Sequence, residues 1–124
     1  MCRMLLSINP IYVKKIFNGT KRFEFRKFKC KNDVESILIY ETAPTMKVVG
    51  EAKIKRILTG NLAEIWLRTR EGSGISKDFY DLYYKNKNSA VVYELDEVTK
   101  YPEPRNLKSY GITQAPQSFR YING

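Results

Sequence analysis

The stretch Gly19-Thr20-Lys21-Arg22-Phe23-Glu24-Phe25-Arg26 lies between a segment with helical periodicity and a segment with strand periodicity. Its two phenylalanines alternate with arginine and glutamate, and this period of two predicts a strand. One face of that strand should enter the core, while the other presents an Arg-Glu-Arg row. Gly19 favours the left-handed conformation that ends a helix, so Lys21 should follow a turn and reach out of the loop.

The residues before this stretch predict a strand and a short helix. The apolar run at residues 4–8 is typical of a buried strand. Asn9 followed by Pro10 favours a helix start, because Asn caps a helix and Pro suits its first turn. Apolar residues at positions 12, 13, 16 and 17 form one stripe of a helix of about two turns, which ends at Asn18-Gly19. Tyr12 and Phe17 belong to this stripe and are expected in the core.

The residues after this stretch predict further strands over 34–42, 48–58, 90–95 and 117–122. Residues 101–104, with two prolines, are expected to end the strand before them. A capping sequence at 61–64 and Ser76 indicate two helix starts. Gly50 inside a predicted strand indicates a bulge or a close backbone approach. The order of elements predicts an α+β fold or a small barrel, not an alternating β-α-β sheet.

Composition narrows the classes of function. The 124 residues are 43% hydrophobic and 28% charged, so we expect one globular domain over residues 1–124. The chain has no histidine, which excludes Ser-His-Asp and Cys-His catalytic groups and histidine metal ligands. Its cysteines, Cys2 and Cys30, are too few for a cysteine-only zinc site. We expect neither a metal nor a cofactor.

The distribution of apolar residues predicts no membrane span, and the N-terminal apolar run is too short for a signal peptide. With two cysteines and no secretion signal, a reducing cytoplasm is the expected location. Both cysteines are interpreted as small apolar side chains.

Positive charge is concentrated in one part of the chain. Lys and Arg number 22 against 13 Asp and Glu, a net charge of +9. Residues 14–31 contain eight basic residues and one acidic residue, a net charge of +7. Such a local field attracts polyanions, nucleic acid first among them. The alternative is a solvated surface whose charge only aids solubility.

Residues 19–26 fit the pattern G-x-K-x-x-E-x-R between a helix and a strand, and this resembles the signature of the ASCH domain, a branch of the PUA-like superfamily. The openings and endings agree: residues 6–10 resemble the first strand and its turn, and residues 115–122 resemble the closing strand of small stand-alone ASCH proteins. The resemblance implies a partly open β-barrel of five to six strands, flanked by three short helices and a cleft that the signature residues line.

The same resemblance implies a function related to RNA. Relatives in the superfamily bind RNA, ASCH domains have been proposed as RNA-binding regulators, a few act as ribonucleases, and one small group hydrolyses acetylated cytidines. Those amidohydrolases use a Lys, a Thr three residues later and a distant Glu. Here Lys21 matches, but the later position holds Glu24, and Thr20 precedes the lysine. This difference weighs against an amidohydrolase.

Three signature residues are the main candidates for a site. Lys21 could bind a phosphate or, if desolvated, act as a base. Glu24 could accept hydrogen bonds from the amino group of a base, or neutralise the neighbouring arginines as a structural ion pair. Arg26 has the planar fork that suits a phosphate or a guanine edge, or it could only pair with Glu24.

Other residues are expected around the same cleft. Ser7 and Asn9 should lie near the signature loop, and Ser118 is expected to approach the cleft from the closing strand. Further nucleic-acid contacts are expected from Lys14, Lys15, Thr20, Arg22, Lys27, Lys29, Gln117 and Arg120. Among aromatic residues, Tyr80 and Tyr84 are expected near the cleft rim. Trp66 lies in the same region, and for it a place in the core is favoured over the rim.

The leading hypothesis is a regulatory domain that binds nucleic acid, RNA in particular, through a basic cleft of nucleotide size. The alternative is an enzyme, either a metal-independent ribonuclease that uses Lys21 and Glu24 or a nucleoside-type amidohydrolase. A third interpretation is a protein-interaction module whose charge is only solubilising.

Overall fold

The strands form one mixed sheet that curls into an open barrel. The computed structural model describes residues 2–27, 29–30, 33–117 and 119–123. Its elements follow the predicted order: β1 (Cys2–Ile8), α1 (Pro10–Phe17), β2 (Phe23–Arg26), β3 (Ser36–Glu41), β4 (Lys47–Asn61), α2 (Leu62–Thr69), α3 (Lys77–Tyr83), β5 (Ser89–Arg105), the 3-10 helix η1 (Leu107–Tyr110) and β6 (Phe119–Asn123).

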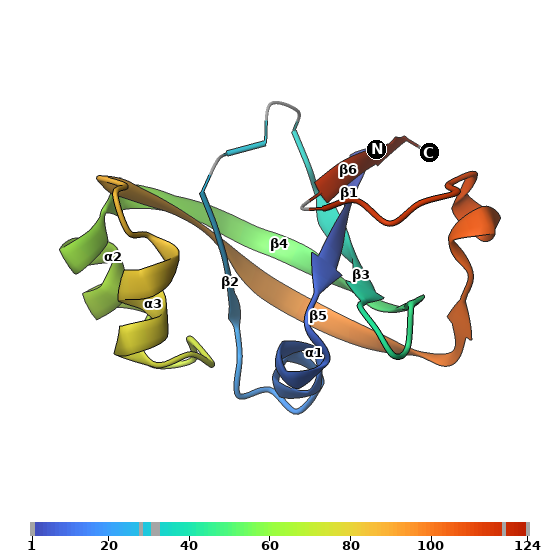
Figure 1. Cartoon of the computed structure of the whole chain (residues 1–124), viewed down its shortest axis with the longest axis horizontal. Coiled ribbons are helices and arrows are strands. Elements are labelled where there is room, and N and C mark those ends of the chain that lie inside the picture. Colours follow the sequence, from blue (N-terminus) through green and yellow to red (C-terminus); the bar gives the residue numbers. More distant parts are fainter. Residues whose placement is uncertain (1, 28, 31–32, 118, 124) are drawn as a thin grey trace.

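The six strands lie in the order β2-β5-β4-β3-β1-β6. β1 and β3 are parallel, and the other neighbouring strands are antiparallel. The long strands β4 and β5 cross the whole molecule, with α2 and α3 at one end and α1 below (Figure 1). The edge strands β2 and β6 share no ladder in the described residues, so the barrel stays open. This confirms the expected α+β fold of PUA-like type.

The central strands are buried on both faces. Leu6 and Ile39 pack into the barrel interior, whereas Leu5 and Leu38 pack on the other side. η1 and Ile112 cover that other side. Because neither face is solvated, the sequences of β1 and β3 are continuous apolar runs and do not alternate between apolar and polar residues.

The three helices begin where the sequence predicts. The side chain of Asn9 accepts a hydrogen bond from the Ile11 amide at 2.9 Å, and Asn61 accepts one from the Glu64 amide at 2.8 Å. Ser76 caps α3 by accepting from the Phe79 amide at 3.1 Å. These caps satisfy amides that have no partner within the first helical turn.

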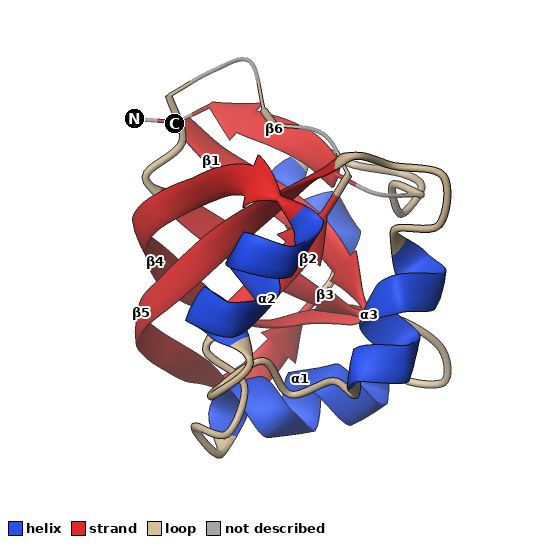
Figure 2. Ribbon diagram, turned by 90° about the vertical axis from the view of Figure 1, so that its left-hand side faces the viewer, coloured by secondary structure: helices blue, strands red, loops and turns tan. Residues whose placement is uncertain are grey.

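α2 and α3 build a second core against β2 and the far end of β4 and β5 (Figure 2). Phe23 and Phe25 of β2 enter this core and meet Tyr80 and Tyr84 of α3. The rings of Phe25 and Tyr80 pack edge to face with centroids 5.6 Å apart. Because side chains alternate along β2, its phenylalanines pack against α2 and α3, and its charged side chains lie on the side toward α1.

β5 is longer than the sequence predicts. Residues 101–104 were expected to end it, and that expectation is wrong, because β5 continues to Arg105. β2 pairs with β5 only from Val91 to Glu94, so the later part of β5 has only β4 beside it among the described strands. Pro102 and Pro104 lie in this edge segment, where a strand tolerates residues without an N–H group.

The helices are short. α1 and α2 each span eight residues, far below the length of about 20 residues that crosses a bilayer. Within the described ranges, no helix has the length and apolar character of a membrane span. The cytoplasmic location stays a prediction.

Gly50 is the point where β4 comes closest to its neighbours. The register of β4 shifts beside it, which confirms the expected bulge. A Cβ added there would collide with the backbone oxygen of Thr99 and lie 2.8 Å from the Cζ atom of Phe17. The strand and α1 can therefore approach this closely only with glycine at this position.

We expect Gly50→Ala to destabilise the protein by about 1–3 kcal/mol, the usual range for overpacking. Gly60→Ala is the matched control in the same strand, because its Cβ would meet only the Ile65 side chain at 3.4 Å. Urea unfolding measures both. Equal stability losses in the two variants would contradict the close approach at Gly50.

Candidate functional site

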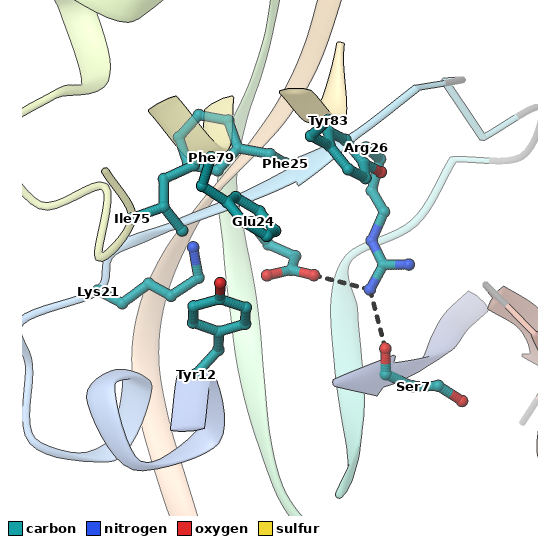
Figure 3. Close-up of a pocket in the computed structure, with 9 residues that line it drawn as sticks. All are labelled: Ser7, Tyr12, Lys21, Glu24, Phe25, Arg26, Ile75, Phe79 and Tyr83. Atoms are coloured by element: carbon teal, nitrogen blue, oxygen red, sulfur yellow. Dashed lines mark hydrogen bonds and ion pairs between the residues drawn. The ribbon is translucent and has the colours of Figure 1, made fainter. Parts of the chain in front are cut away.

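A small pocket opens where β1, α1, β2 and α3 converge, and residues from all four elements enter it (Figure 3). Its volume is about 180 Å³. The pocket is lined by Ser7, Tyr12, Lys21, Glu24, Phe25, Arg26, Ile75, Phe79 and Tyr83. The turn after α1 and the alternation of β2 thus bring Lys21, Glu24 and Arg26 to one wall.

Lys21 is buried, although the sequence placed it in an exposed loop. Its residue surface is only 3% exposed, and its Nζ donates a hydrogen bond to the Ser73 carbonyl oxygen at 2.7 Å. The amine also lies 5.3 Å from the Tyr12 ring centroid and 4.9 Å from that of Phe25. Gly74 packs on the lysine stem so closely that a Cβ there would lie 2.6 Å from Lys21 Cβ.

Burial lowers the pKa of Lys21 to about 8, because the ammonium form loses its hydration. The carboxylate of Glu24 opposes this shift, while the positive charges of Lys15 and Arg26 add to it. At neutral pH the amine is therefore largely charged, yet it can lose its proton within the range in which enzymes work.

Glu24 and Arg26 form an ion pair in the pocket wall. Glu24 Oε2 accepts a hydrogen bond from the Arg26 guanidinium at 2.7 Å, and both side chains are largely buried. The same nitrogen of Arg26 lies 3.3 Å from the carbonyl oxygen of Ser7. The Ser7 hydroxyl in turn donates to the Pro116 carbonyl at 2.6 Å. The carboxylate lies between the amine of Lys21 and the guanidinium (Figure 3).

Aromatic side chains complete the pocket. Phe79 is 40% exposed and stacks on Tyr83 with an angle of 10° between the rings. Tyr12 meets Phe79 edge to face at 5.7 Å. Burial, and to a smaller extent Glu24, raises the pKa of Tyr12; burial also raises the pKa of Tyr83, against the charge of Arg26. Both hydroxyls keep their protons at neutral pH and can donate.

Lys15 and Arg22, two of the predicted nucleic-acid contacts, hold the loop that follows α2. Lys15 Nζ donates to the Gly74 carbonyl at 2.9 Å. A guanidinium nitrogen of Arg22 donates to the Glu71 carbonyl at 3.1 Å, and its backbone amide donates to the Gly72 carbonyl at 2.7 Å. Together with Lys21, these residues fix residues 71–74 against the turn after α1.

The remaining predicted residues are dispersed. Thr20 bonds to the Asn18 side chain at the end of α1, and Asn9 is a helix cap. Lys14 lines a separate groove on the other side of α1. Lys27 and Gln117 line a pocket that adjoins the first one. Lys29 and Arg120 are exposed and line none of these pockets. Lys31 and Ser118 lie outside the described residues.

The sequence pattern predicted the wrong aromatic residues at the rim of the pocket. Tyr80 and Tyr84, expected at the cleft rim, are each 1% exposed and belong to the second core. Phe79 and Tyr83 line the pocket instead. Trp66 packs beside Tyr80 with centroids 4.8 Å apart, which agrees with the favoured place in the core.

Tyr12 was also missed as a pocket residue. It belongs to the apolar stripe of α1, as expected, but it is only half-buried and its hydroxyl points into the pocket (Figure 3). Lys15, three residues later on the same helix, was a signal in the sequence, because a cation at this spacing can approach the Tyr12 ring. The approach of Lys21 to the same ring is seen only in the structure.

Comparison with known proteins assigns the family. The model described as "Domain of unknown function (DUF365)" matches residues 5–121. The chain belongs to this family. The solved structure of ASCH from Zymomonas mobilis superposes with a TM-score of 0.88 at 26% identity, covering 98% of this chain and 87% of that one. This likeness confirms the resemblance to ASCH domains that residues 19–26 carry.

Two curated relatives are similar in sequence. One is the ASCH domain-containing ribonuclease of Zymomonas mobilis, 28% identical over 92 residues, which cover 73% of this chain and 62% of that protein. The other is large ribosomal subunit protein uL22 of Ureaplasma parvum serovar 3, 33% identical over 120 residues. That match covers 96% of this chain but only 39% of the ribosomal protein. The chain thus spans less than two thirds of either relative.

The lowered pKa of Lys21 makes stability depend on pH. Between about pH 8 and the ordinary lysine value of 10.5, the unfolded chain holds a proton that the folded chain has lost. The free energy of unfolding, compared with that of the Lys21→Met variant, should therefore rise by about 1.4 kcal/mol per pH unit within this range. Chemical unfolding of both proteins from pH 7 to 10.5 measures the difference, and a pH-independent difference would contradict the burial of the amine.

Proposed function

We propose that this protein binds single-stranded RNA and takes one nucleotide into the pocket between α1, β2 and α3. The observation that carries the proposal is the combination of groups at one small opening: a buried amine, a carboxylate–guanidinium pair and an exposed aromatic ring. The likeness to ASCH domains, one of them named as a ribonuclease, supports an RNA-related function.

The chemistry of the pocket suits a nucleobase better than a larger ligand. Its volume of about 180 Å³ is below the range of about 300–1,000 Å³ that is usual for drug-sized ligands. Phe79 offers a ring face on which a base can stack. Glu24 can accept from an exocyclic amino group, and the Tyr12 hydroxyl can donate to a ring nitrogen or carbonyl. Bases exposed on a single strand present these edges.

The basic surface would act outside the pocket. Lys14, Lys27 and Lys29 are exposed, so they can contact phosphates without disturbing the fold. Lys15 and Arg22 contribute charge from positions where they also hold the 71–74 loop. Affinity that depends on such contacts falls as salt rises, because counterions are released from the nucleic acid.

A second candidate function is metal-independent cleavage of RNA. It is favoured by the presence of Lys21 and Glu24 in the same pocket and by the curated ribonuclease relative. Glu24 would take the proton of a ribose 2′-hydroxyl as its oxygen attacks the phosphorus. The ammonium of Lys21 would give its proton to the departing 5′-oxygen. The products would be a 2′,3′-cyclic phosphate and a 5′-hydroxyl.

Phe79→Ala should weaken the binding of single-stranded RNA by about 1–3 kcal/mol, the usual contribution of one base stacked on an aromatic ring. Leu82→Ala is the matched control, because Leu82 is 69% exposed on the same helix and does not line the pocket. Fluorescence anisotropy with a labelled oligonucleotide at low salt measures both. Absence of RNA binding, or equal losses in both variants, would contradict the proposal.

If the protein cleaves RNA with Lys21 as the acid, kcat/KM should fall about tenfold per pH unit above the Lys21 pKa of about 8. Cleavage should continue in EDTA and be lost in Lys21→Ala and Glu24→Gln. Gel analysis of a labelled oligonucleotide across pH 6–10 measures this. If the RNA is not cleaved, or if cleavage survives both substitutions, the second candidate function is wrong.

A further inference from the structure

A second pocket adjoins the first at the open side of the barrel. It has a volume of about 440 Å³ and is lined by residues of the two edge strands and their neighbours: Met4, Leu6, Arg26, Lys27, Tyr83, Tyr93, Gln117 and Phe119. Arg26 and Tyr83 line both pockets. The two pockets are therefore adjacent, with a guanidinium and an aromatic ring at their border.

The second pocket combines an apolar interior with a polar edge. Met4 and Leu6 of β1 are buried, and Phe119 of β6 packs against the same core. Gln117 and Lys27 are exposed at the edge. Such a pocket offers apolar surface for a ring, together with an amide that can both donate and accept hydrogen bonds.

Positive charge lies where the two pockets meet. The Lys27 amine is 4.8 Å from the centroid of the Tyr83 ring, which faces both pockets. The guanidinium of Arg26 lies at the same border and is held by Glu24 and the Ser7 carbonyl. A ligand that enters both pockets would pass this border, and a phosphate is the group that two cations there favour.

We propose that the second pocket binds the nucleotide next to the one in the first pocket, so that the smallest ligand filling the site is a dinucleotide. This inference rests on the proposed binding of RNA in the first pocket. The linking phosphate lies at the border beside Arg26 and Lys27. The second base lies against Phe119 and Tyr83, with the Gln117 amide at its edge.

The arrangement implies a linear single strand as the substrate. Two bases that enter separate pockets must be unstacked from each other, which a duplex does not allow without melting. Lys55 of β4 is exposed and lines neither pocket. Lys55 therefore provides a control for the loss of one positive charge away from the path of the dinucleotide.

Calorimetry with nucleotides of defined length tests the inference. The probes are nucleoside 3′-monophosphates and dinucleoside monophosphates of the four bases, all with 2′-O-methyl riboses so that no cleavage occurs. The best dinucleotide should bind at least about tenfold more tightly than the best mononucleotide, the gain expected for one more stacked base. A third nucleotide should add much less than the second.

Variants separate the two pockets. Gln117→Ala should weaken the dinucleotide and leave the mononucleotide unchanged. Lys27→Ala should weaken both, because the 3′-phosphate of the mononucleotide also lies at the border, whereas Lys55→Ala should affect both little. All three substituted side chains are exposed, so the fold should persist, and circular dichroism checks this. Phe119→Ala should reduce the dinucleotide to the affinity of the mononucleotide, provided that its melting curve stays cooperative.

The outcomes distinguish the two proposals. If a ten-residue RNA binds but the dinucleotide shows no gain over the mononucleotide, the second pocket is not a nucleotide site and only this inference fails. The same holds if Gln117→Ala and Lys27→Ala leave dinucleotide binding unchanged. If the mononucleotides, the dinucleotides and the ten-residue RNA all fail to bind, the proposed function fails.

Discussion

The contact between the Lys21 amine and the Ser73 carbonyl joins the two parts of the chain from which the pocket is built. It ties the turn after α1 to the loop before α3, and the backbone bond from Arg22 to Gly72 strengthens the same junction. Because a buried ammonium without a partner would be costly, the loop must remain where it supplies this acceptor. The position of α3, and thus of its aromatic residues, depends on that constraint.

The wall opposite the loop is held by a different kind of interaction. Glu24 and Arg26 satisfy each other on the side of β2 that faces away from the phenylalanines, and Arg26 reaches β1 through the Ser7 carbonyl. This ion pair stiffens the wall and still leaves charged groups lining the pocket. The two interpretations of Glu24 as ion pair and as ligand are therefore compatible.

Local patterns predicted most of the fold correctly. Helix caps, the alternation of β2, the glycine at position 50 and the order of elements all depend on neighbours close in sequence, and each is seen in the structure. The end of β5 was predicted wrongly from its prolines, because a strand tolerates proline where no neighbouring strand needs its N–H group, and this depends on the tertiary structure. In α3, the four apolar residues spread over one broad face of a seven-residue helix, so periodicity could not select which of them line the pocket.

The sequence alone determined the types of element, their order and the group of charged residues on which a site could be built, because these follow from spacing within one segment. Only the tertiary structure decided that Lys21 is buried, that Lys15 and Arg22 hold a loop, and that Phe79 and Tyr83 line the pocket. Burial and pKa depend on what packs across from a residue. For Lys21 that partner lies 52 positions away in the chain, beyond the reach of any local pattern.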